Sequence, residues 1–104
     1  MAQYDVHRYA RPGSPVRFVL DVQSDLLDVI DTRVVVPLYP MDESARPALR
    51  LNPVVEVPGE NDHFYLSTAE LAAVHRSALG DRVANLAERH DEIIAALDLV
   101  FTGV

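Results

Sequence analysis

Histidines and acidic residues are the side chains of this sequence that could hold a metal ion or move a proton. There are four histidines, His7, His63, His75 and His90, and 16 acidic residues. No two histidines have the i, i+4 spacing that places both imidazoles on one face of a zinc-binding helix. His90 lies in an apolar stripe, so we expect it to pack against the core. We expect no metal and no cofactor.

Recognisable patterns for covalent or phosphate chemistry are also missing. The sequence has no cysteine, which excludes thiolate chemistry and disulfides. No serine lies in a G-x-S-x-G context, and no phosphate loop or dinucleotide fingerprint occurs. The carboxylates are scattered, so the sequence singles out no acid–base pair. Nothing argues for catalysis, and we expect that the protein is not an enzyme.

Composition and charge restrict the class of protein and of partner. With 104 residues, 49% hydrophobic and 24% charged, we expect one globular domain over residues 1–104. The net charge of -7, with arginine as the only basic residue, disfavours nucleic acid and anionic membranes as direct partners. The polar N-terminus lacks a signal-peptide core and no apolar run reaches 18 residues, so we expect a cytoplasmic protein.

Hydrophobic periodicity predicts several strands. Residues 16–22 alternate with a period of two and are rich in branched and aromatic side chains, which is typical of a strand. We also expect strands over 3–9 and over 33–38, the second ended by Pro37 and Pro40. Residues 51–57 and 63–67 predict a hairpin around the turn at 58–62.

Two segments favour helix. From Asp81 onward, apolar residues recur every three or four positions and predict an amphipathic helix of about five turns. Ser67 and Glu70 match a capping box before an alanine-rich stretch, which favours a second helix over 67–79. Taken together, the elements predict an α+β or mainly β fold: a small barrel of mostly antiparallel strands with one C-terminal helix.

Two apolar features do not fit a simple core. Leu26 and Leu27 are adjacent in a polar connection, where two neighbours do not easily face one core. The plainer alternative is that one is buried and the other partly so, and the other alternative is that at least one is exposed. The sequence closes with VFTGV, where Gly103 permits a left-handed turn after the helix. Asp98 near the helix end opposes the macrodipole. An exposed patch from Phe101 to Val104 would be an interaction surface, although packing of the last turn is the plainer alternative.

The stretch FVLDVQSDLLD resembles a segment of CcdB-type toxins, in which F-V-D-V-Q-S-D is followed by two isoleucines and an aspartate. Six further segments resemble the family in the same order. They are QYDVHRY, VVVPL, LNPVV, STAELAAV, GDRVANL and FTGV, the last where the family has F-W-G-I. The resemblance therefore extends over the whole sequence.

The resemblance implies an SH3-like barrel, a homodimer and a toxin of a toxin–antitoxin module. Such toxins bind the A polypeptide of DNA gyrase (gyrase A) and trap the enzyme on cleaved DNA, while a cognate antitoxin neutralises them. The residues that match the family's gyrase-binding positions are Leu26, Leu27, Asp98, Phe101, Thr102, Gly103 and Val104. For residues 72–79 the resemblance implies extended chain, and we follow it there in place of helix.

This sequence departs from the family at the tail. Thr102 stands where the family has a tryptophan, Asp98 where it has asparagine, and Val104 where it has isoleucine. Loss of a buried aromatic ring costs about 3 kcal/mol, or roughly a hundredfold in affinity. We therefore expect the fold to carry over better than the potency.

Antitoxin contacts are expected in the proline-containing loops, with Arg11, Tyr39, Met41 and Arg46 as the candidate residues. The acidic charge favours a basic antitoxin segment. Two alternatives to a gyrase toxin stay open. One is an endoribonuclease of the same fold class, with Arg11, Arg17 and Arg33 in a basic groove. The other is an antitoxin-binding module without gyrase activity.

Overall fold

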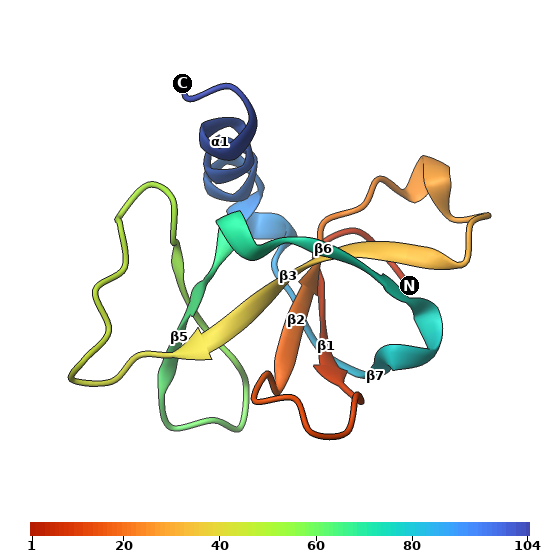
Figure 1. Ribbon diagram of the computed structural model, residues 1–104, viewed down its shortest axis with the longest axis horizontal. Coiled ribbons are helices and arrows are strands. Elements are labelled where there is room, and N and C mark those ends of the chain that lie inside the picture. The colour runs from red at the N-terminus through yellow and green to blue at the C-terminus, as the bar shows by residue number, and fades with distance from the viewer.

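The computed structural model describes all residues 1–104 and places seven antiparallel strands in one strongly curved sheet (Figure 1). The strand order is β4-β5-β3-β2-β1-β7, and β6 also pairs with β3. The strands are β1 (Asp5–Tyr9), β2 (Phe18–Asp21), β3 (Thr32–Pro40), β4 (Val54–Glu56), β5 (His63–Leu66), β6 (Ala72–His75) and β7 (Leu79–Asn85). One helix, α1 (His90–Phe101), follows β7.

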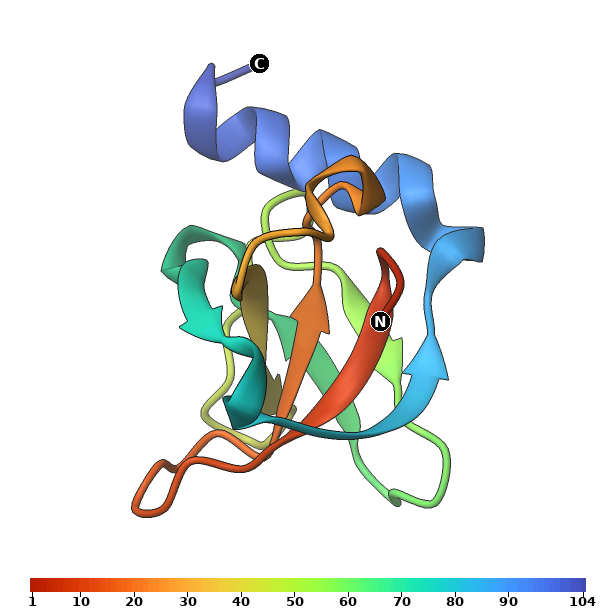
Figure 2. The same ribbon diagram turned by 90° about the vertical axis from the view of Figure 1, so that its right-hand side faces the viewer.

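The curved sheet and α1 enclose the core. Figure 2 shows α1 lying across one end of the sheet. Ile93 of α1 joins a buried cluster that includes Val6, Leu20 and Leu38, while Phe18 and Phe64 meet edge to face at 5.5 Å between ring centroids. A sheet that is apolar on its concave face is stabilised when a helix covers that face. The predicted fold class, a small barrel of mostly antiparallel strands with one C-terminal helix, is confirmed, and the strands form a half-barrel.

The strand predicted over 33–38 extends from Thr32 through Pro37 to Pro40. Within a strand, the N–H and C=O of one residue point to the same side, and the carbonyl of Pro37 accepts a hydrogen bond from the Ser67 amide at 3.0 Å. Proline has no backbone N–H, and the side of Pro37 on which an N–H would lie therefore faces Ser67 rather than β2. At this point β3 changes partner from β6 to β5, so no ladder hydrogen bond is lost.

The C-terminal helix is shorter than predicted. Residues 79–85 form β7, which pairs with β1, and a 3₁₀ turn η4 (Ala87–Arg89) precedes α1. The pairing with β1 satisfies the backbone of this segment, and the Leu86 amide donates to the Tyr4 carbonyl at 2.8 Å. Strand pairing thus overrides the helical periodicity before His90. With 12 residues, α1 is too short to cross a lipid bilayer, and so is every other helix.

The segment 67–79 is not helical. It contains a 3₁₀ turn η2 (Thr68–Glu70), then β6, then a second turn η3 (Arg76–Ala78). Ser67 makes no side-chain capping bond, so the predicted capping box is wrong. β6 pairs with residues 32–35 of β3, which outweighs the helical preference of its alanines. The extended chain expected for 72–79 is confirmed except at η3.

Candidate interaction surfaces

The β2–β3 loop (residues 22–31) carries an exposed apolar surface. Its 3₁₀ turn η1 (Asp25–Leu27) begins at Ser24, whose hydroxyl accepts a hydrogen bond from the Leu26 amide at 3.2 Å. Leu26 is 91% exposed and Leu27 49% exposed. Both adjacent leucines therefore face solvent, so the alternative in which one of them is buried is wrong. Val29 and Ile30 extend the same apolar surface.

A buried arginine lies beneath this loop. Arg33 on β3 has no exposed surface and pairs with Asp21 of β2 at 2.7 Å. Burial raises the pKa of Asp21, and the adjacent guanidinium opposes this effect. Arg33 also contacts Asp28 at 3.1 Å, within the loop. The hypothesis that Arg33 lines a basic groove for RNA is therefore wrong, because its guanidinium is buried and forms ion pairs with Asp21 and Asp28.

Gln23 connects the same buried group to η1. Its side chain is almost fully buried and donates to the Leu27 carbonyl at 3.3 Å, while its amide oxygen accepts from the Val34 backbone at 3.1 Å. Its backbone carbonyl accepts from Arg33 at 3.4 Å. The backbone of the two exposed leucines is thus fixed by hydrogen bonds, from Gln23 to the Leu27 carbonyl and from the Leu26 amide to Ser24, rather than by packing of their side chains.

The C-terminal tail (residues 101–104) forms a second exposed apolar surface. Phe101 is 70% exposed and Val104 81% exposed. Gly103 has φ of 77°, and its amide donates to the Asp98 and Leu99 carbonyls, which confirms the predicted left-handed turn. The Thr102 hydroxyl donates to the Asp98 carbonyl at 2.8 Å. Thr102 is therefore turned back onto the helix, and the tail has no aromatic group beyond Phe101.

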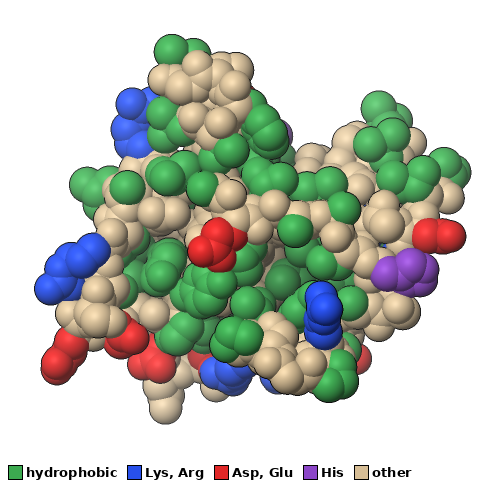
Figure 3. All heavy atoms as spheres, viewed as in Figure 1, with side chains coloured by type: hydrophobic (Ala, Val, Ile, Leu, Met, Phe, Trp, Pro, Cys, Tyr) green, Lys and Arg blue, Asp and Glu red, His purple; other side chains and the backbone are tan.

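The β2–β3 loop and α1 project from the same end of the molecule. Figures 1 and 2 both place them above the body of the sheet. In Figure 3, hydrophobic side chains lie at the tip of the loop, and a few lie on the upper end of the helix among tan atoms. The exposed carboxylate of Asp98 lies in the last turn of α1, where it meets the negative end of the helix dipole.

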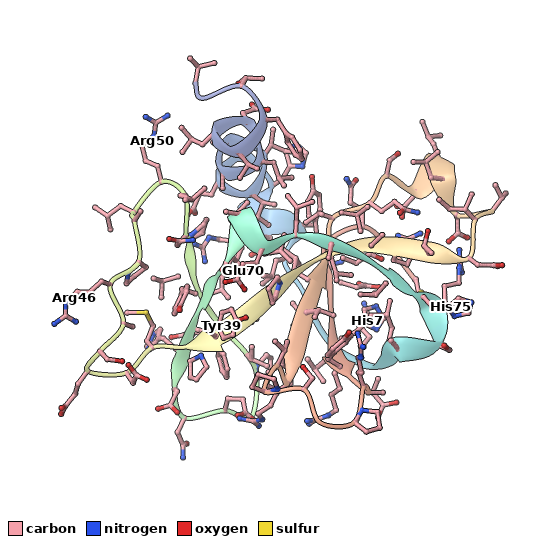
Figure 4. All side chains as sticks on the ribbon, in the orientation of Figure 1. His7, Tyr39, Arg46, Arg50, Glu70 and His75 are labelled. Carbon is pink, nitrogen blue, oxygen red and sulfur yellow. The ribbon has the colours of Figure 1, made fainter.

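A groove of about 220 Å³ opens on another face, over β1, β2, β3 and β6. Glu70 of η2 is its only charged lining residue, and the Tyr39 hydroxyl donates to the Glu70 carboxylate at 2.7 Å. Figure 3 shows an acidic group surrounded by hydrophobic surface where Figure 4 labels Glu70 beside Tyr39. The remaining lining residues are Tyr9, Ser14, Val16, Val19, Val35, Pro37, Ala72 and Val74.

The contact between Tyr39 and Glu70 changes how the phenol titrates. The hydrogen bond to Glu70 raises the pKa of Tyr39 from 10.0 to about 12. Since the folded pKa exceeds the unfolded one, neutral Tyr39 stabilises the fold fully below pH about 10, and this stabilisation is lost as the pH rises through about 12. Ultraviolet titration should show one of the four tyrosines shifting to lower pKa after Glu70→Gln. An unchanged titration curve would contradict the contact.

The candidate antitoxin residues are not all brought together. Tyr39 lines the groove. Arg11 lines an adjoining hollow, and Tyr9 and Ser14 line both the groove and this hollow. Met41 lies just after β3 and is half-buried. Arg46 donates to nearby backbone carbonyls of its own loop, and Figure 4 shows it pointing away from Tyr39. Sequence reasoning misses Glu70 in the groove, because its spacing from Ser67 suggests a helix cap instead.

The histidines are dispersed. No three His, Cys, Asp or Glu side chains are grouped as a metal site would need. His7 is buried, with Nδ1 3.0 Å from the Gly80 carbonyl oxygen. His90 does not pack into the core as expected: it is exposed at the first residue of α1 and meets the Tyr4 ring edge to face at 5.2 Å.

Solved structures of two toxins share this fold. One is described as an endoribonuclease in complex with its cognate antitoxin from a mycobacterial species. It has a TM-score of 0.77 and 17% identity, over 96% of this chain and 93% of the other. The second is the Mycobacterium tuberculosis toxin MazF-mt6, with a TM-score of 0.75 and 19% identity, over 93% and 95% of the two chains.

These likenesses correct the expectation that the protein is not an enzyme. That expectation rests on missing motifs. Two solved structures with this fold, each 17% identical to this sequence, are described as endoribonucleases. The absence of a recognisable catalytic motif therefore carries no weight against catalysis on this scaffold. At these identities the likeness establishes the fold alone.

The comparison with protein families matches residues 3–103 to CcdB, described as the CcdB protein. The match includes the β2–β3 loop, the groove and nearly all of the C-terminal tail. It also agrees with the resemblance of the segments from QYDVHRY to FTGV to CcdB-type toxins. The chain therefore belongs to the CcdB family, a family of toxins from toxin–antitoxin modules.

Proposed function

We propose that the protein is a toxin that binds gyrase A and traps DNA gyrase on cleaved DNA. The observation that carries the proposal is the exposure of Leu26 and Leu27 on a hydrogen-bonded loop, at the positions where the family has its two isoleucines. Leucine keeps the volume and apolarity of isoleucine. Phe101 and Val104, at the same end of the molecule, supply the second part of the surface.

The energetics support a protein partner for this surface. Complete burial of an exposed leucine is worth about 1.5–3 kcal/mol, so Leu26 and Phe101 together offer several kcal/mol to a partner that covers them. Interface centres are typically apolar, and charged groups are depleted there. Asp98 beside the tail is unfavourable for such a centre, so we expect an affinity below that of tryptophan-bearing relatives.

The direct test is binding of the purified protein to gyrase A by isothermal titration calorimetry. We expect a complex with micromolar or tighter affinity and a negative heat-capacity change, the signature of apolar burial. Because the enthalpy of apolar burial passes through zero near room temperature, the titration is repeated at a second, well-separated temperature. Absence of heat at both temperatures, with a folded sample, would contradict the proposal.

The substitution Thr102→Trp should strengthen gyrase binding. The Thr102 side chain is exposed and bonds only to the Asp98 carbonyl, so a larger residue meets no steric barrier. Tryptophan adds a large rigid contact area, and we expect an affinity gain of roughly tenfold to a hundredfold. Calorimetry with gyrase A measures the gain. Thr102→Ser is the matched control, and an equal affinity for all three proteins would place the tail outside the interface.

The groove is proposed as the place where the antitoxin is captured. Its apolar lining suits the apolar side chains of an extended segment, and the Glu70 carboxylate among them suits a lysine or arginine of that segment. Arg11 at the adjoining hollow is within the same surface. The overall charge of -7 also favours a basic partner segment.

A homodimer is proposed from the exposed edge of β6. This strand pairs with β3 on one side only, and Ala72 and Ala73 on it are exposed. Small apolar residues on a free strand edge permit close approach of a second chain. Light scattering at micromolar concentration should give twice the 11.5 kDa of one chain. A monomer mass would contradict the dimer.

RNA cleavage at the groove is the second candidate function. It is favoured by a carboxylate and two phenols, from Glu70, Tyr39 and Tyr9, that line the same groove. Arg11 lines the hollow that adjoins the groove. If the groove cleaves RNA, Glu70→Gln should lower the rate by about 10²–10⁴-fold, the usual contribution of a general base. The assay is cleavage of a fluorogenic RNA, with Glu88→Gln as the control. No cleavage by the unchanged protein would remove this candidate.

A further inference from the structure

The β2–β3 loop follows a defined path although its side chains bury little. Residues 25–32 are all exposed, and Leu26 and Val29 are each 91% exposed. Beyond the buried Val22 and Gln23 at its start, the loop gains little from the hydrophobic effect that would fix its conformation. Its path must therefore depend on hydrogen bonds, and several of these come from a residue outside the loop.

That residue is Arg76, which lies in η3 directly after β6. Its Nη2 donates both to the backbone carbonyl of Asp28 and to the Asp28 carboxylate, the latter at 2.8 Å. Its Nε donates to the Ile30 carbonyl at 3.1 Å, and its backbone amide donates to the Asp31 carbonyl at 2.9 Å. Four acceptors within residues 28–31 are thus held by one arginine.

Asp28 joins Arg76 to the buried arginine beneath the loop. Its Oδ1 accepts from Arg76 at 2.8 Å and from Arg33 at 3.1 Å, so one carboxylate oxygen is shared by two guanidinium groups. The hydrogen bond from Arg76 lowers the pKa of Asp28 below its ordinary value, because it favours the ionised carboxylate. Arg33 holds the carboxylate from β3, and Arg76 holds it from the β6 side.

The effect of this arrangement reaches the leucines through the backbone. The Ile30 amide donates to the Leu27 carbonyl at 3.2 Å, and Gln23 donates to the same carbonyl from the core. Ile30, whose carbonyl accepts a hydrogen bond from Arg76, is therefore hydrogen-bonded directly to Leu27, one of the two leucines of the apolar surface.

We propose that Arg76 is a positioning residue: it fixes the β2–β3 loop through Asp28 and Ile30 and so preorganises Leu26 and Leu27 for their partner. A loop that is already ordered loses less conformational entropy on binding, so the same contacts give a higher affinity. The part of this inference that concerns gyrase rests on the proposed function. The ordering of the loop can be measured without any partner.

The test compares Arg76→Gln with Arg50→Gln. Both changes remove one positive charge, but Arg50 lies in the connection between β3 and β4, and Figure 4 shows it pointing away from the molecule. The Arg76 side chain is 30% exposed and outside the core, so the fold should survive its replacement. Circular dichroism and the melting temperature confirm this for each variant.

Amide hydrogen exchange measured by NMR is the first readout. In Arg76→Gln, the amides of Leu27 and Ile30, both hydrogen-bonded within the loop, should exchange at least tenfold faster, while core amides such as that of Leu20 keep their rates. Arg50→Gln should leave all of them unchanged. Equal loop exchange in the two variants, with Arg76→Gln folded, would overturn the inference.

Affinity for gyrase A is the second readout. A fivefold or greater loss in Arg76→Gln, with none in Arg50→Gln, supports the positioning role. Faster loop exchange with unchanged affinity overturns that role. If the unchanged protein does not bind gyrase A at all, the proposed function has failed, and hydrogen exchange alone then decides whether Arg76 orders the loop.

Discussion

Replacing both exposed leucines with aspartate, Leu26→Asp and Leu27→Asp, is expected to abolish gyrase binding while leaving the fold intact. Burying two carboxylates in an apolar contact removes the favourable burial of about 3 kcal/mol or more and adds a desolvation cost. The affinity should therefore fall by more than a hundredfold. Calorimetry with gyrase A measures it, and loss of toxicity on expression in cells provides a second measure.

The control for this double substitution is Leu49→Asp. Leu49 is 88% exposed, similar to the 91% of Leu26, but it lies in the connection between β3 and β4. A single aspartate placed there should change neither binding nor toxicity. If the double substitution binds gyrase A as tightly as the unchanged protein, the β2–β3 loop is not the gyrase surface.

The second large effect is expected on stability, from Asp21→Ala. Arg33 has no exposed surface, so removal of its closest partner at 2.7 Å leaves a buried charge with weaker compensation. Breaking a buried ion pair costs about 3–5 kcal/mol. We expect a loss near the lower end of this range, because Asp28 and Asp25 still approach the guanidinium at 3.1 and 3.7 Å. Urea unfolding followed by circular dichroism measures the change.

The double substitution Asp21→Leu with Arg33→Met provides the comparison. It replaces both charges with apolar groups, so no uncompensated charge stays buried, and its loss of stability should be smaller than that of Asp21→Ala. Loop exchange should nevertheless increase in the double variant, because Asp28 loses its contact with Arg33. A larger destabilisation by the double substitution than by the single one would contradict this account of the ion pair.

The strands could be predicted because their side-chain patterns are strong and local. The alternation around β2 and the hairpin of β4 and β5 place these elements within a few residues of their observed bounds. The segment before α1 could not be predicted, because its apolar spacing fits a helix as well as a curved edge strand. Pairing of β7 with β1, which lies at the other end of the sequence, decides between them.

The apolar parts of the candidate site could be predicted, whereas its polar support could not. Two adjacent leucines in a polar connection are visible in the sequence. The hydrogen bonds that hold them come from Gln23, Arg33 and Arg76, and the last is 48 residues away from Asp28. The burial of Arg33 could not be foreseen, because arginine is usually exposed and nothing local shows that aspartates surround it.

The most direct test of the central claim is a DNA cleavage assay with gyrase, ATP and supercoiled plasmid, in which the complex is denatured after incubation with the protein. The proposal predicts linear DNA at micromolar protein, more of it with Thr102→Trp, and none with the Leu26→Asp, Leu27→Asp variant. Absence of linear DNA with both the unchanged protein and Thr102→Trp would contradict a gyrase-trapping toxin.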